Sequence, residues 1–160
     1  MSHKISSKAI LEALTSEKNN KGAAFTIQSR ATGKDYTYRI KRSLFDKNNQ
    51  WYTHVYVEQM VGGERGFVRL GTYAGGEIKN KGVVNSTPAA IALAWVLKHV
   101  EKGAIDWVDA HVDVMHLGKC LVCNKTLTDA ISIETGLGPV CDGGRSRKKA
   151  PKGILTPVIS

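Results

Sequence analysis

A group of three cysteines and one histidine restricts the fold of this 160-residue chain more than any other feature. Two residues separate Cys120 from Cys123, His116 lies four positions before Cys120, and Cys141 completes the group. Two cysteines at this spacing let a tight turn direct both thiolates at one ion, and a histidine on the preceding strand can add an imidazole nitrogen. The spacing predicts one zinc ion bound by His116, Cys120, Cys123 and Cys141.

The predicted zinc site is closed. The chain has 3 cysteines, and an odd number argues against a disulfide framework and indicates a reducing compartment. Four protein ligands leave no coordination position for water, so we expect the ion to stabilise the fold rather than to hydrolyse a substrate. We therefore predict about one structural zinc ion per chain and no enzymatic activity.

The loop between Cys123 and Cys141 has signals for short turns. Thr128 or Asp129 can cap a short helix, and Gly136 can end it in the left-handed conformation. Proline after Gly138 then favours a second turn, whose amides would point at Cys141. This arrangement is typical of a treble-clef or zinc-ribbon lobe.

The cysteine segment also has a longer pattern, which reads Gly118-Lys-Cys120-x-x-Cys123-x-x-x-Leu127-Thr128-Asp129-x-x-Ser132-Ile133-x-x-Gly136-x-Gly138-Pro139-x-Cys141. It resembles a zinc-binding domain of unknown function found mostly in bacteriophage and bacterial proteins, and the likeness covers roughly residues 114–144. This chain has Ala130 where the family has proline and Asn124 where it has glycine. Neither position is a ligand. The resemblance implies metal binding and a phage or prophage setting rather than an activity.

Length and composition indicate one domain with a core and a small metal lobe, since 42% of the residues are hydrophobic. The longest apolar stretch, residues 89–100, is too short to span a bilayer, and the chain does not begin like a signal peptide. We expect a cytoplasmic protein, in the host cytoplasm if it is phage-encoded, with no membrane partner and no small-molecule substrate.

The pattern before the cysteines predicts a helix, four strands and a second helix. Ser6 or Ser7 can cap the first helix, which would end near Ser16, while Thr87 and Pro88 begin the second. Residues 104–115 alternate in polarity and read as a strand or an extended linker. Turn residues separate the four strands, which are predicted at residues 25–30, 35–42, 51–60 and 67–73.

These elements predict an α+β fold in which an antiparallel four-stranded sheet packs against two helices, with a small C-terminal treble-clef or zinc-ribbon-like lobe. We expect the α+β body to span residues 1–112, the zinc-binding lobe 113–144 and a flexible basic tail 145–160.

The formal charge of +9 suits a polyanionic partner. Two groups of cations are predicted to contact nucleic acid: in the second-strand region Arg30, Lys34, Arg39, Lys41 and Arg42, and in the tail Arg145, Arg147, Lys148 and Lys149. The alternative for the tail is a solvated, solubilising terminus. The rings of Tyr52, His54 and Tyr56 either project outward to stack on unpaired bases or pack in the core.

Two functions remain open. The first is a zinc-stabilised, phage-encoded accessory protein that binds DNA or RNA through its basic hairpin and tail. The second is a phage effector that binds a host protein, such as a polymerase or a defence complex, and inhibits or redirects it. A nuclease site at Asp106, Asp109, His111 and Asp113 is disfavoured because these carboxylates alternate with apolar residues and no second acidic cluster faces them in the sequence.

Overall fold

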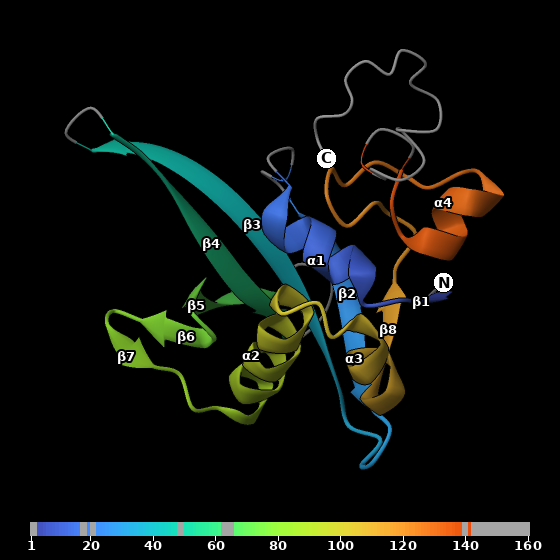
Figure 1. Cartoon of the computed structure of the whole chain (residues 1–160), viewed down its shortest axis with the longest axis horizontal. Helices are drawn as coiled ribbons and strands as arrows, with labels where there is room; N and C mark the ends of the chain where they lie inside the picture. The colour runs from blue at the N-terminus through green and yellow to red at the C-terminus, as the bar shows by residue number, and fades with distance from the viewer. Residues whose placement is uncertain are drawn as a thin grey trace.

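The structure is a computed structural model that describes residues 3–16, 19, 22–47, 50–61, 66–138 and 141. In this part of the chain there are eight strands and four helices, drawn in Figure 1. The strands are β1 (His3–Ile5), β2 (Ala24–Ser29), β3 (Asp35–Lys47), β4 (Gln50–Met60), β5 (Phe67–Ala74), β6 (Glu77–Asn80), β7 (Val83–Val84) and β8 (Val112–His116). The helices are α1 (Lys8–Thr15), α2 (Pro88–Glu101), α3 (Ile105–His111) and α4 (Ala130–Thr135).

All eight described strands form one antiparallel sheet in the order β1-β8-β2-β3-β4-β5-β6-β7. The predicted four-stranded sheet with two packing helices and a treble-clef or zinc-ribbon-like lobe is therefore wrong. The strands β1, β6 and β7, which the prediction missed, have only 3, 4 and 2 residues, too few to show a clear alternating pattern. Strand β8, with 5 residues, lies at the end of the segment 104–115 that was predicted as a strand or an extended linker. Strand β8 also pairs with β1 and β2 from the far end of the chain, which a local pattern cannot reveal.

The four predicted strands correspond to β2, β3, β4 and β5, and each pairs with the next. Strands β3 and β4 have 13 and 11 residues, and their hairpin extends beyond the helices (Figure 1). The pairing of β4 with β5 shifts register between Val57 and Glu58. Gly71 lies at this irregularity with φ +147°, and an added Cβ would come within 2.4 Å of the Lys79 carbonyl oxygen. This position therefore requires glycine.

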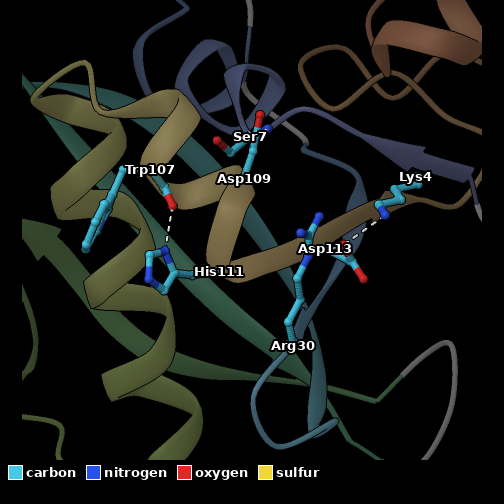
Figure 2. Close-up of polar contacts among 7 residues, drawn as sticks. All are labelled: Lys4, Ser7, Arg30, Trp107, Asp109, His111 and Asp113. Atoms are coloured by element: carbon cyan, nitrogen blue, oxygen red, sulfur yellow. Dashed lines mark hydrogen bonds and ion pairs between the residues drawn. The ribbon is translucent and has the colours of Figure 1, made fainter.

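The two predicted body helices are present as α1 and α2. Thr87 caps α2 by accepting a hydrogen bond from the Ala90 amide, and Pro88 occupies the first turn, as predicted. Ser7 precedes α1, but its side chain makes no capping bond. The helix instead begins next to the carboxylate of Asp109, a residue of α3, which lies beside Ser7 in Figure 2. The Ser7 amide donates to Asp109 Oδ1 and the Ser6 hydroxyl donates to Asp109 Oδ2, each over 2.8 Å.

Helix α3 replaces most of the predicted strand or linker over residues 104–115. Only residues 112–116 are extended. The order of polar and apolar residues in this segment fits both the repeat of a helix and the alternation of a strand. Burial follows the helical repeat, because Val108 is fully buried whereas Trp107 is 54% exposed. The apparent alternation was therefore misleading at Trp107.

The core lies between the sheet and the helices. Helices α1, α2 and α3 lie on the same side of the sheet in Figure 1, and the alternate side chains Tyr38, Ile40 and Val57 are buried. The Tyr38 hydroxyl donates to the Ala89 carbonyl oxygen over 2.7 Å, which joins β3 to the first turn of α2. Leu121 and Leu137, beyond β8, belong to the same hydrophobic cluster. The other face of the sheet, which carries Arg39, Lys41 and Glu58, has none of these three helices over it.

Candidate metal centre and nucleic-acid interface

The structure brings together the three cysteines that the sequence singled out. The sulfur atoms of Cys120, Cys123 and Cys141 all lie within 4.8 Å of one another. Cys120 and Cys141 are buried, and Cys123 is half-buried. Three thiols this close have the donor type and spacing that a soft cation such as zinc requires. The clustering of these three cysteines supports the prediction of a metal site and does not identify the metal.

The backbone around Cys120 forms the turn that places two of the sulfurs together. The amide of Asn124 donates to the Cys120 carbonyl oxygen over 2.9 Å, and Asn124 has φ +66°, a conformation that asparagine tolerates. The Val122 amide points at the Cys120 sulfur, 3.4 Å away. An isolated bridge between Lys119 and Thr126 joins the two sides of the turn.

Helix α4 fixes the return of the chain toward Cys141. Asp129 caps it, accepting from the Ser132 amide over 3.2 Å and from the Ser132 hydroxyl over 2.6 Å. Gly136 ends it with φ +79°, as predicted, and an added Cβ would lie 2.6 Å from the Ile5 side chain. The Cys141 amide donates to the Gly138 carbonyl oxygen. Pro139, which was expected to open a second turn, lies outside the described residues.

The electrostatics of the three thiols favour a bound cation. Burial raises the pKa of Cys120, but hydrogen bonds from the backbone of Gly138, Cys123 and Val122 outweigh it, and the net shift is downward. Burial and the neighbouring Cys120 charge raise the pKa of Cys141 to about 12. Without a cation, the negative charge of the Cys120 thiolate therefore disfavours ionisation of Cys141. A divalent metal ion would remove this conflict, because it neutralises the sulfur charges where they meet.

His116 lies outside the group of three sulfurs. It is fully buried at the end of β8, and both ring nitrogens have backbone partners. Its Nδ1 accepts from the Gly118 amide over 2.9 Å, and its Nε2 lies 2.7 Å from the Ile133 carbonyl oxygen. Since a carbonyl only accepts, Nε2 carries the hydrogen. The histidine links β8 to α4, and its role as a fourth metal ligand stays a prediction.

Three cations and two aromatic rings gather on the open face, by which we mean the sheet face opposite α1, α2 and α3. The Arg39 guanidinium lies 3.9 Å from the centre of the Phe67 ring, and that of Arg69 lies 4.4 Å from the centre of the Tyr56 ring. Tyr56 is opposite Lys41 in the strand pairing, which makes it a neighbour of that cation. Tyr56 and Phe67 are half-buried, and Arg69 is exposed.

Glu58 reduces the positive charge of the open face. Its carboxylate oxygens lie 2.7 Å from Arg39 and 3.6 Å from Lys41, so two of the predicted nucleic-acid residues share one counter-charge. Arg69, which the prediction did not include, is directly opposite Glu58 on the neighbouring strand. The strand pattern could have suggested Arg69, since Val68 and Leu70 flank it.

The other predicted cations are placed differently. Arg30 and Lys4 both pair with Asp113, at 2.9 and 3.1 Å (Figure 2), while Lys34 is exposed and Arg42 half-buried. Burial raises the pKa of Asp113, but the hydrogen bonds and positive charges of Lys4 and Arg30 lower it by more. The net shift of this pKa is downward. The tail cations Arg145, Arg147, Lys148 and Lys149 lie outside the described residues. The side chain of Tyr52 is not described either, so the choice between stacking on bases and packing in the core is not tested for this residue.

The residues considered for a nuclease site have contacts elsewhere. Asp109 binds the N-terminus of α1, Asp113 pairs with two cations, and the Nδ1 of His111 lies 2.8 Å from the Trp107 carbonyl oxygen (Figure 2). Among the described residues, the only cluster with the spacing of metal ligands is that of the three cysteines.

Comparison with known proteins finds one similarity, and it covers the cysteine segment. A family model described as "Family of unknown function (DUF6011)" matches residues 110–146. No curated protein and no solved structure matches the chain. The match covers less than half of the chain, so it supports the resemblance of this segment to a family of unknown function and assigns no activity.

No helix in the described part of the chain combines the length and apolar character needed to cross a membrane.

Proposed function

We propose that this chain is a zinc-stabilised, phage-encoded accessory protein that binds single-stranded nucleic acid on the open face of its sheet. The observation that carries the proposal is the clustering of Arg39, Lys41 and Arg69 with the rings of Tyr56 and Phe67 on that face. Cations that follow the phosphates and aromatic rings that stack on unpaired bases are the two components of single-strand binding. The basic tail would add further phosphate contacts.

The metal part of the proposal is one structural zinc ion per chain. Cys120, Cys123 and Cys141 would hold it, and His116 stays the predicted fourth ligand, although its Nδ1 would have to release the Gly118 amide. Such an ion would supply fold stability and no hydrolytic chemistry. The phage setting rests on the resemblance of the cysteine segment alone.

Metal analysis and X-ray absorption spectroscopy test this part. We expect about one zinc ion per purified chain and three sulfur neighbours around it. A nitrogen neighbour that disappears in His116→Gln would identify the histidine as a ligand, whereas a nitrogen that persists would exclude it. Protein that keeps its fold with no bound metal would contradict the structural role.

Binding of a fluorescent single-stranded oligonucleotide at several salt concentrations tests the nucleic-acid part. We expect Lys41→Gln and Arg69→Gln each to weaken binding and to reduce the slope of log affinity against log salt by about 0.7 per lost phosphate contact. Removing the ring in Tyr56→Ala should cost about 1–3 kcal/mol of binding if a base stacks on it. Lys102→Gln, an exposed charge change at the end of α2, is the matched control and should leave affinity nearly unchanged.

Two outcomes would overturn the nucleic-acid proposal. One is background affinity for every oligonucleotide at low salt, and the other is an equal loss in Arg69→Gln and the Lys102→Gln control. Either result would leave binding to a host protein as the function to test, by capture of partners from host lysate.

A further inference from the structure

A groove with a volume of about 390 Å³ lies between α2, the end of α3 and the β2–β3 hairpin. It is distinct from the cysteine cluster and from the open face, because it is on the side of the sheet that the helices cover. Its walls are mainly apolar and include Ile27, Tyr36, Ile91, Trp95 and Val112. Its size falls within the range of about 300–1,000 Å³ that is usual for small-molecule sites.

Part of the apolar wall is in contact with solvent, although Ile27 and Val112 are buried. Ile91 is 56% exposed, and the rings of Tyr36 and Trp95 are only half-buried. Burying apolar surface gains roughly 25 cal/mol per Å², so a ligand that covers these side chains would recover free energy that the fold leaves unused. The two rings on the walls favour a flat, aromatic ligand, which can pack against them by offset or edge contacts.

The charged and polar side chains that line the groove favour a negatively charged ligand. Lys34 lines the groove, is exposed, and has no ion pair within the described part of the chain. None of the described lining residues is acidic. His111 also lines it, with its ring centre 5.8 Å from that of Trp95. The Trp107 carbonyl fixes the hydrogen of His111 on Nδ1, which leaves Nε2 as an acceptor for a polar ligand group (Figure 2).

We propose that this groove binds a small aromatic anion, with its ring against Trp95 and Tyr36 and its negative group near Lys34. This binding is independent of the metal centre and of nucleic acid. The charge complementarity with Lys34 and the apolar, aromatic walls together select this class of ligand over a neutral aliphatic one.

Two fluorescent probes of similar shape test the proposal on the full-length, zinc-loaded protein. The first is 8-anilinonaphthalene-1-sulfonate, an aromatic sulfonate, and the second is N-phenyl-1-naphthylamine, which has the same rings without the charge. We expect the sulfonate to bind once per chain and to quench tryptophan emission. Lys34→Gln should weaken sulfonate binding several-fold and leave the uncharged probe unaffected, while Ile91→Ser should weaken both.

Matched variants separate the groove from general surface hydrophobicity. Val83→Ser removes another exposed aliphatic side chain, on β7, and Lys102→Gln removes another exposed cation. We expect both to bind the probes like the unaltered protein, and urea unfolding should confirm that all four variants are folded. The proposal is overturned if Ile91→Ser and Val83→Ser lose the same affinity, or if Lys34→Gln does not discriminate between the two probes.

Discussion

The hydroxyl of Tyr38 is a single group that joins the sheet to α2. Both the ring and its hydrogen bond to the Ala89 carbonyl are buried. Burial, and to a lesser extent the nearby Tyr36, raise the pKa of Tyr38 far above its ordinary value, so the hydroxyl stays protonated as a donor. We expect Tyr38→Phe to lower the free energy of unfolding by about 1 kcal/mol, measured by urea denaturation, because it removes this hydrogen bond and keeps the ring.

Tyr36→Phe is the matched control for this prediction. Tyr36 is on the same strand with its ring 6.2 Å from that of Tyr38, but its hydroxyl has no hydrogen bond to the described residues. We expect its substitution to change stability by only a few tenths of a kcal/mol. Equal losses in the two variants would show that the Ala89 contact contributes nothing specific.

Single residues also show how far the sequence predicts the site. Spacing along the chain was sufficient to identify the three cysteines, since a CxxC turn and a return loop are local features. It could not determine whether His116 faces the sulfurs or the carbonyl of Ile133, because that depends on where α4 packs. In the same way, Glu58 on β4 offsets Arg39 and Lys41 on β3, and only the strand register brings them together.

At the level of elements, α1 depends on a residue that is about a hundred positions away in the sequence. The helix has only 8 residues, and Asp109 accepts from both Ser6 and Ser7 at its N-terminus. A helix this short has little stability of its own, and a lost N-terminal cap costs about 0.5–2 kcal/mol. We expect Asp109→Ala to destabilise the protein by this amount and to speed hydrogen exchange of the α1 amides.

Asp106→Ala provides the comparison for α1. Asp106 is an exposed carboxylate on the same helix, α3, and lies in its first turn. Its removal can affect α3 through the helix dipole, but exchange in α1 should remain unchanged. If exchange in α1 responds to both substitutions alike, Asp109 does not act as the cap.

Elements with strong local signals were predictable, and those defined by distant pairing were not. The caps of α2 and the alternation of β2 to β5 are local, and these elements were found near their observed bounds. Strand β1 pairs only with β8 among the described strands, and β8 also pairs with β2, so no short window of sequence shows this arrangement, although most of β8 falls within the segment predicted as a strand or linker. Helix α3 was missed because seven residues are compatible with both a helical and an extended period.

At the level of the whole molecule, the cysteine segment packs directly on the N-terminal elements. A Cβ added at Gly136 would meet the side chains of Ile5 of β1 and Ala9 of α1, and Leu121 and Leu137 share the main core. Structural zinc contributes an apparent folding energy of about 10–16 kcal/mol, comparable with the about 5–15 kcal/mol that stabilises a typical domain. We expect Cys120→Ser or Cys141→Ser to disorder residues from about 116 onward and to loosen β1, while β2 to β5 and α2 stay folded.

Limited proteolysis with mass spectrometry measures this outcome. Cleavage should begin after residue 116 in either variant, and chelation of the unaltered protein should give the same fragments. Added zinc should restore protection to the unaltered protein and not to the variants. A C-terminal segment that stays protected in Cys141→Ser would show that packing alone holds it.

The position of β8 between β1 and β2 has a consequence for synthesis on the ribosome. Residues 3–5 are made about a hundred residues before their partner strand, residues 112–116. At about 5–20 residues per second, the first strand must wait on the order of 10 s before its partner is translated. We therefore expect the nascent chain to complete this edge late, with residues 3–5 accessible to chaperones until then.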